Sequence, residues 1–126
     1  MEDLNVLVVD DSKLTRHLIT QALHTRDILH IVFAEDGEEA KEKMEGINLV
    51  ITDWMMPRLD GLGFTRWLRA QTAYQHLPVI MITSNFDDAD LSEARQAGVD
   101  VFCEKSFSVD DLFTAIDAVA DRLPDT

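Results

Sequence analysis

The stretch Leu49-Val50-Ile51-Thr52-Asp53 decides the expected fold, because a short apolar run there ends directly on a carboxylate. Such a run is too short for a typical helix and is typical of a strand that is buried on both faces of a sheet. Four other stretches share this character, and segments long enough for helices separate them. The five expected strands cover residues 4–9, 28–34, 47–52, 78–83 and 99–104.

The alternation of short strands with helical segments predicts an α/β fold. Five βα units in succession, (βα)5, indicate a doubly wound parallel five-stranded sheet with helices on both faces. Residues that cap helices support this division. Asp36 followed by Glu39 resembles a capping box, with Gly46 as the glycine after the end of that helix. Ser108 is expected to begin the last helix, and Gly98 to end the fourth.

The composition restricts the classes of protein to which the chain can belong. Its 126 residues include 24 Asp and Glu against 11 Lys and Arg, a formal charge of −13. This excess of acid argues against direct binding of nucleic acid or of an anionic membrane surface, and no apolar run approaches the ~18 residues of a membrane span. The single cysteine, Cys103, excludes an internal disulfide framework and fits a reducing compartment, so we expect a cytoplasmic protein. The length, with 46% hydrophobic residues, predicts one domain over residues 1–126.

Polar side chains stand at the carboxyl ends of four expected strands. Asp10 and Asp11 follow the first strand and Asp53 the third, while Thr83 ends the fourth and Lys105 follows the fifth. In an open parallel sheet, ligands bind outside the carboxyl ends of the strands, at the point where the strand order reverses. We therefore expect these residues to meet at one edge of the sheet. Taken singly, each has an ordinary explanation as a helix cap, a loop residue or a surface charge, so their joint placement carries the argument.

The types of these side chains predict chemistry on a phosphoryl group. Three neighbouring carboxylates repel one another, and a hard divalent cation with oxygen ligands, Mg²⁺ above all, relieves that repulsion. Lys105 adds a positive charge, and Thr83 adds a hydroxyl that can bind an oxyanion. Asp53 is the natural nucleophile, because carboxylates can form acyl phosphates. Asp10 and Asp11 would then hold the metal.

These residues belong to four motifs that occur together in one family. The chain resembles the receiver domain of bacterial two-component response regulators (CheY-like) and is similar to the single-domain chemotaxis receiver. The motifs cover residues 8–12, 52–61, 82–84 and 104–107, in the order of the family. The resemblance implies a flavodoxin-like strand order, 2-1-3-4-5.

The resemblance also implies how the site works. Asp53 would accept a phosphoryl group from a histidine kinase, from a histidine phosphotransfer protein or from a small phosphodonor. Lys105 would pair with that group, and the domain would assist its own phosphotransfer and dephosphorylation rather than act as an enzyme on a separate substrate. The implied Mg²⁺ ligands are Asp10, Asp11, Asp53 and the backbone carbonyl of Met55.

A switch from the site to the surface follows from the same resemblance. Thr83 would hydrogen-bond the phosphoryl group and draw Phe102 inward, which alters the surface of the fourth helix, fifth strand and fifth helix. From its position alone, Phe102 can equally be an ordinary core or edge aromatic. The altered surface would bind a downstream protein target, or an output domain that follows Thr126. The kinase would dock on residues 12–16, which can equally begin an ordinary amphipathic helix.

Two positions depart from the family pattern. Ser106 follows the lysine where the family usually has a proline in a cis peptide; a cis bond to another residue costs about 3 kcal/mol, which favours a trans bond here. The aim of the Lys105 side chain, and with it the speed of phosphotransfer, is then in question. Met55 and Asn85 stand where the family flanks the path of attacking water. Because Met55 cannot orient water by a strong hydrogen bond, we expect modest self-dephosphorylation.

Two other functions compete with this interpretation. A haloacid-dehalogenase-type phosphohydrolase also combines an Asp nucleophile, Mg²⁺, a hydroxyl and a Lys. That class normally has a second acid two residues after the nucleophile, where this chain has Met55, and the chain is short for such enzymes. A receiver-like interaction module without phosphorylation is the other alternative, and the complete set of acids argues against it.

Overall fold

Five parallel strands form the centre of the chain in the computed structural model, which describes residues 4–84 and 87–123. The strands run in the order β2-β1-β3-β4-β5, and every neighbouring pair is parallel. This confirms the predicted doubly wound α/β sheet with the flavodoxin-like order. The strands are β1 (Asn5–Val9), β2 (His30–Ala34), β3 (Leu49–Asp53), β4 (Val79–Thr83) and β5 (Val101–Glu104).

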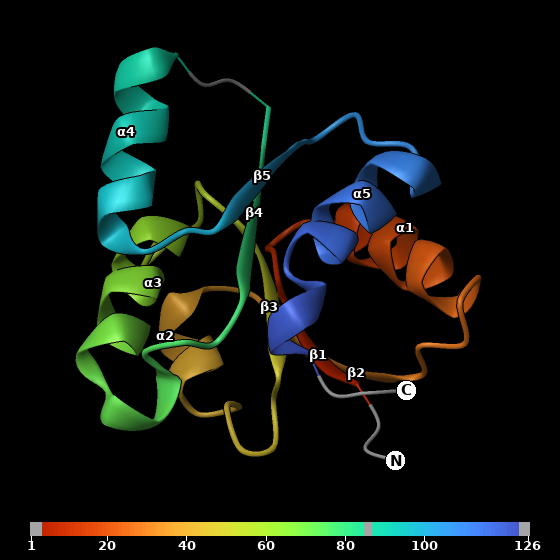
Figure 1. Cartoon of the computed structure of the whole chain (residues 1–126), viewed down its shortest axis with the longest axis horizontal. Helices are drawn as coiled ribbons and strands as arrows, with labels where there is room; N and C mark the ends of the chain where they lie inside the picture. The colour runs from red at the N-terminus through yellow and green to blue at the C-terminus, as the bar shows by residue number, and fades with distance from the viewer. Residues whose placement is uncertain (1–3, 85–86, 124–126) are drawn as a thin grey trace.

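Helices cover both faces of the sheet, so the molecule has three layers (Figure 1). Helices α1 and α5 pack on one face, and α2, α3 and α4 pack on the other. The helices are α1 (Lys13–His24), α2 (Gly37–Lys41), α3 (Gly61–Ala70), α4 (Asp88–Ala97) and α5 (Val109–Ala118), with 3-10 turns at Thr72–Tyr74 and Ala120–Arg122.

The apolar side chains of each central strand divide between two cores. On β1, Val6 and Val8 lie in the core beneath α1 and α5, whereas Leu7 and Val9 lie in the core beneath the other three helices. Successive side chains of a strand point to opposite faces, so a strand covered by helices on both sides must be apolar throughout. All five residues of β3 are buried, as expected for a strand at the centre of the sheet.

Most helix ends follow the sequence signals, although the predicted capping box of Asp36 and Glu39 forms only its N-cap half and Gly46 ends no helix. Asp36 accepts a hydrogen bond from the Glu39 N–H at the start of α2, and Ser108 forms a reciprocal capping box with Asp111 at the start of α5. Gly98 ends α4 with a φ of 112°. The prediction for Gly46 was wrong, because α2 already ends at Lys41 and Gly46 takes its positive φ in a later turn. A Gly in the left-handed region marks a turn as readily as a helix end.

The prediction that every strand is buried on both faces was wrong for β2. His30, Val32 and Phe33 are exposed on this strand. The reason is its place in the sheet: β2 lies at an edge and pairs only with β1, and the helix that follows it has only five residues. This strand therefore carries apolar side chains that remain exposed to solvent.

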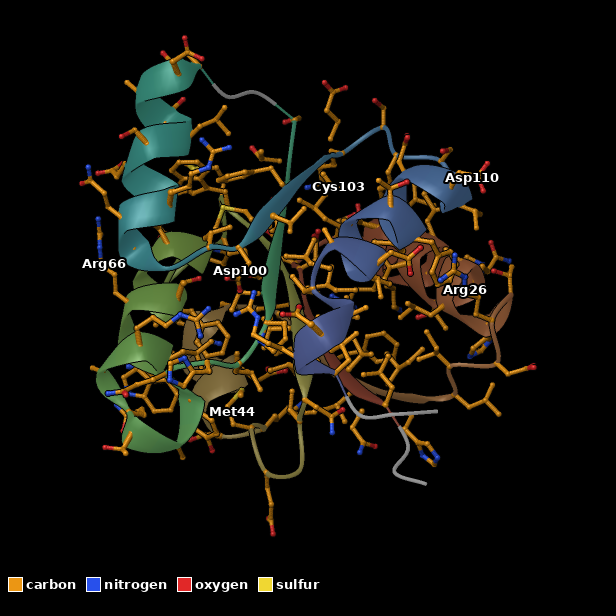
Figure 2. All side chains as sticks on the ribbon, viewed as in Figure 1. Arg26, Met44, Arg66, Asp100, Cys103 and Asp110 are labelled. Atoms are coloured by element: carbon orange, nitrogen blue, oxygen red, sulfur yellow. The ribbon has the colours of Figure 1, made fainter. Side chains whose placement is uncertain are left out.

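Cys103 and Arg26 illustrate the packing of α5 (Figure 2). Cys103 is buried on β5, and its burial, together with the nearby Asp111 and Glu104 carboxylates, raises the pKa of the thiol to about 11. A thiol with a raised pKa is little ionised at neutral pH and is therefore a weak nucleophile. The Arg26 guanidinium, just after the end of α1, lies 2.9 Å from an Asp117 oxygen of α5.

None of the helices in the described part of the chain combines the length and the apolar character that a membrane span needs.

Replacing Leu112 by Ala tests the core beneath α1 and α5. The Leu112 side chain is fully buried, so its truncation leaves a cavity and should lower the free energy of unfolding by about 2–5 kcal/mol. Leu18→Ala is the matched control, since Leu18 on α1 is 45% exposed, and should change stability by less than about 0.5 kcal/mol. Urea unfolding of both variants measures the difference, and equal losses would contradict this account of the core.

Candidate functional site

The polar residues at the strand ends meet at the carboxyl edge of the sheet. Asp53 and Thr83 are the last residues of β3 and β4, and Lys105 follows β5 directly. The register pairs Val9 of β1 with Thr52 of β3, so the residues after Val9 lie level with Asp53. Three carboxylates then gather at this edge: Asp10, Asp11 and Asp53 each offer one oxygen, and these oxygens lie within 4.8 Å of one another.

Asp53 is held in place from two sides. Its Oδ1 accepts a hydrogen bond from the Trp54 N–H at 2.8 Å, and its Oδ2 accepts one from Lys105 Nζ at 2.8 Å. The start of α3 packs tightly behind it: a Cβ on Gly61 would come within 2.1 Å of the Asp53 carbonyl oxygen. Only a glycine permits this approach, so Gly61 is part of what places Asp53 at the edge.

Asp10 is a buried carboxylate with one oxygen left without a hydrogen bond. Only 1% of the residue is exposed, and its Oδ1 accepts from the Ser12 N–H at 2.8 Å. Its Oδ2 is buried and accepts no hydrogen bond from any described residue. The nearby Lys105 ammonium lies 3.7 Å from this oxygen, beyond hydrogen-bond distance. A buried acceptor without a hydrogen bond is costly, and a bound cation would offset that cost.

The electrostatics of Asp10 agree with this interpretation. Burial raises the pKa of Asp10 to about 6, and the charges of Asp53 and Asp11 act in the same direction, while the Ser12 N–H and Lys105 oppose them. The negative charge of the three carboxylates is therefore greater than Lys105 alone can neutralise. Three oxygen donors, of which that of Asp11 is exposed to water, match the ligands that Mg²⁺ prefers, so the residues present fit this metal.

Lys105 reaches the site in spite of the residue that follows it. All peptide bonds of the described residues are trans, so the bond to Ser106 is trans as the cost of a cis bond predicts. The Lys105 N–H donates to the Thr83 carbonyl at 3.0 Å, which fixes the backbone there. Although burial alone would lower it, the hydrogen bond to Asp53 and the charge of Asp10 raise the pKa of Lys105 above its usual value. The trans bond therefore does not turn the ammonium away from Asp53.

The remaining predicted residues lie around this centre. The Met55 side chain is 73% exposed on the connection between β3 and α3. Thr83 is buried, and Phe102 is half-buried on β5, where it packs against the core beneath α2, α3 and α4. Arg95 of α4 lies over the Phe102 ring, 5.6 Å from its centroid. Asn85 lies outside the described residues.

Several contacts near the site were not predicted from the sequence. Arg16 of α1 donates to the Asp10 carbonyl at 2.7 Å, and Arg58 donates from Nε to an Asp36 oxygen at 2.6 Å. Arg16 lies in the first turn of α1, six residues after Asp10, so this contact joins residues that are close along the chain. The partners Arg58 and Asp36 are 22 residues apart, and no pattern in the sequence joins them.

Comparison with known families decides the class of the chain. The response regulator receiver domain family matches residues 6–117. The chain belongs to this family. The predicted resemblance is thereby confirmed. The family assignment does not favour the phosphohydrolase alternative.

Individual relatives agree with the assignment. The receiver domain is 35% identical over 108 residues to the chemotaxis protein CheY1 of Helicobacter pylori, covering 83% of this chain and 87% of that protein. It is also 35% identical to a CheY homolog of Campylobacter jejuni, covering 83% of each. Among solved structures, the chemotaxis protein CheY4 of Vibrio cholerae has a TM-score of 0.85 at 27% identity, covering 94% of this chain and 99% of that one.

Asp10→Asn tests the cost of holding the third charge at the site. The raised pKa means that folding takes up a proton between pH 4 and pH 6, so the stability that Asp10 contributes falls as the pH rises through about 6. Without divalent cations, Asp10→Asn should be more stable than wild type at pH 7.5 by at most about 3 kcal/mol, which corresponds to a shift of about two pKa units.

The advantage of Asp10→Asn should shrink as the pH falls toward 4, because wild type regains stability by protonation. Thermal unfolding in the presence of a chelator measures it. Asp117→Asn, an exposed acid of α5 remote from the site, is the control that removes the same charge. A difference between Asp10→Asn and wild type that stayed constant with pH would contradict the electrostatic assignment.

Proposed function

We propose that this receiver domain takes a phosphoryl group onto Asp53, in a Mg²⁺-dependent reaction, from a histidine kinase or a histidine phosphotransfer protein. The arrangement around Asp53 supports this most directly: its Oδ2 accepts from Lys105 Nζ, and the unpartnered buried oxygen of Asp10 lies at the same edge. A carboxylate between an ammonium and a cation site is suited to accept a phosphoryl group, because the positive charges on both sides stabilise the negative charge of that group.

The proposed reaction is an exchange of one bond for another at phosphorus. A carboxylate oxygen of Asp53 forms the new P–O bond, while the P–N bond to the donor imidazole breaks and its electron pair stays on that nitrogen. Lys105 moves from the carboxylate toward the phosphoryl oxygens and stabilises their charge. The Thr83 hydroxyl donates a hydrogen bond to the same phosphoryl oxygens. The product is an acyl phosphate that water later hydrolyses.

The metal ligands in this proposal are the carboxylates of Asp10, Asp11 and Asp53 and the backbone carbonyl of Met55. When bound, Mg²⁺ supplies positive charge that offsets the repulsion between these acids and the incoming phosphoryl group. The chain's own contribution is to hold the oxygens together: the Ser12 N–H orients Asp10, and the Trp54 N–H orients Asp53.

We further propose that phosphorylation is transmitted to the face formed by α4, β5 and α5. Thr83 and Phe102 would move together toward the phosphoryl group, since they lie on the neighbouring strands β4 and β5. Helices α4 and α5 lie on either side of β5 in Figure 1. A groove of about 380 Å³ runs between β5 and α5 and includes Phe102 in its lining. A downstream protein target, or a C-terminal output domain, would bind this face.

The phosphodonor is proposed to dock on α1 beside the site. Leu14 is 67% exposed and Leu18 is 45% exposed, four residues apart on one face of this helix. Helix α1 begins directly after Asp11 and Ser12, so a partner that covers these leucines also approaches the carboxylates. Exposed leucines at this spacing suit packing against a helix of a donor protein.

The wider interpretation follows from the family. We propose that residues 1–126 form a single receiver domain that works in the cytoplasm through protein contacts, as a signalling domain that assists its own phosphotransfer and dephosphorylation. The charge of −13 disfavours direct contact with nucleic acid or an anionic membrane. A buried Asp10 carboxylate destabilises the fold, and a receiver-like module without phosphorylation would gain nothing from keeping it.

Phosphorylation by a small donor tests the central proposal. Wild type incubated with acetyl phosphate and Mg²⁺ should gain the mass of one phosphoryl group, because a small donor replaces the histidine protein. Asp53→Asn is the matched control and should gain none. Intact-mass spectrometry measures both. Absence of the gain in wild type, an equal gain in Asp53→Asn, or catalytic turnover of the donor without a stable adduct would each contradict the proposal.

Met55→Asn tests the expectation of modest self-dephosphorylation. The Met55 side chain is exposed beside Asp53 and cannot orient an attacking water by a strong hydrogen bond, whereas an amide can. The variant should shorten the lifetime of the phosphorylated state, which intact-mass spectrometry follows after removal of the donor. Met55→Leu keeps an apolar side chain and should leave the lifetime near that of wild type. An unchanged lifetime in Met55→Asn would count against this role.

A further inference from the structure

The connection between β3 and α3, residues 54–60, carries Met55 and therefore one of the proposed metal ligands. Its two ends are tied to the site and to the helix. The Trp54 N–H donates to Asp53 Oδ1 at 2.8 Å, and the Trp54 carbonyl accepts from the Gly61 N–H at 2.8 Å. Between these ends the segment forms neither helix nor strand, so its position depends on contacts with other parts of the chain.

Those contacts join the segment to the start of α2. The Gly37 N–H donates to the Leu59 carbonyl at 2.8 Å. A Cβ on Gly37 would come within 2.8 Å of that same carbonyl oxygen, so the two backbones approach as closely as a glycine allows. Arg58 adds a charged contact: its Nε donates to Asp36 Oδ2 at 2.6 Å, and its guanidinium forms an ion pair with the same carboxylate.

Asp36 is a rigid and buried partner for Arg58. Only 1% of the residue is exposed, and its other oxygen accepts from the Glu39 N–H at 2.9 Å as the N-cap of α2. Burial alone would raise the pKa of Asp36, but the Glu39 N–H and the Arg58 guanidinium hold it below its usual value. The carboxylate therefore stays charged at neutral pH and gives Arg58 a fixed anchor.

The backbone of Arg58 is held in an unfavourable conformation. Its φ is 65°, in the left-handed region, where the Cβ of a residue with a side chain crowds the backbone. A glycine would adopt this turn without strain. The Arg58 side chain extends instead to Asp36. We call this ion pair, together with the left-handed turn at Arg58, the Arg58–Asp36 clasp.

We propose that Arg58 is a positioning residue for the metal and phosphoryl site, and that the Arg58–Asp36 clasp holds the connection so that the Met55 carbonyl faces the carboxylates. This rests on the proposed function of the site. Arg58 does not touch the metal ligands itself; it acts through the three residues that separate it from Trp54 at the anchored end. Partners of this kind commonly affect metal affinity about tenfold or more when they are removed.

The test is the affinity of the unphosphorylated chain for Mg²⁺ alone, measured by isothermal titration calorimetry at low temperature, where circular dichroism shows each variant to be folded. Arg58→Gly removes the side chain and relieves the left-handed strain, and should weaken Mg²⁺ binding about tenfold. Asp36→Asn keeps an N-cap acceptor but loses the charge, and should weaken it similarly. Because the two residues act as one unit, the double variant should lose little more than either single variant.

The controls come from a second ion pair remote from the site, Arg26 with Asp117. Arg26→Gly adds the same negative charge as Arg58→Gly, and Asp117→Asn removes the same charge as Asp36→Asn, but both should bind Mg²⁺ like wild type. Non-specific electrostatics would strengthen binding in Arg58→Gly and weaken it in Asp36→Asn, so a loss in both separates positioning from net charge. Arg58→Lys keeps the cation without the guanidinium fork and should lose less than Arg58→Gly.

The outcomes distinguish this inference from the function on which it rests. If wild type binds no Mg²⁺, the proposed metal site fails and the clasp fails with it. If wild type binds Mg²⁺ but Arg58→Gly and Asp36→Asn bind as tightly as the two control variants, the clasp proposal alone is overturned. Should Arg58→Gly fail to fold, Arg58→Lys and Asp36→Asn decide the question by the same comparison.

Discussion

Three carboxylates repel one another at the carboxyl edge of the sheet, and the fold must oppose that repulsion. Asp10 is buried, and its neighbours Asp53 and Asp11 are also acids, so the folded chain holds these charges together against their repulsion. Strands β1 and β3 do this because both are buried in two apolar cores and are locked in parallel register. The stability of those cores offsets the electrostatic cost.

Lys105 compensates the repulsion only in part. Its ammonium is within hydrogen-bond distance of Asp53 but lies 3.7 Å from Asp10 Oδ2, and that buried oxygen accepts no hydrogen bond from the described residues. The folded chain therefore keeps excess negative charge at this edge of the sheet, which fits a site for a cation. Such an arrangement responds strongly to any change in charge, which is the property that a phosphorylated signalling domain requires.

Most predictions that depend on residues close along the chain succeeded, although Gly46 does not end a helix. The cap at Ser108, the buried strand at Leu49–Asp53 and the end of α4 at Gly98 all depend on local backbone geometry, and the structure confirms them. They failed for β2, whose apolar residues were taken as buried. Burial of Val32 depends on what lies beside the strand, and an edge strand has a neighbour on one side only.

By itself, the sequence determined the class of fold and the residue types at the carboxyl ends of the strands, because alternating apolar runs and helix caps are local properties of the chain. The strand order came from the resemblance to a family. Three features required the folded structure: Lys105 contacts Asp53 although a trans bond joins it to Ser106, one Asp10 oxygen accepts no hydrogen bond from the described residues, and Arg58 meets Asp36. Each of these depends on side chains from separate strands and loops meeting in space, and no spacing along the chain specifies such a meeting.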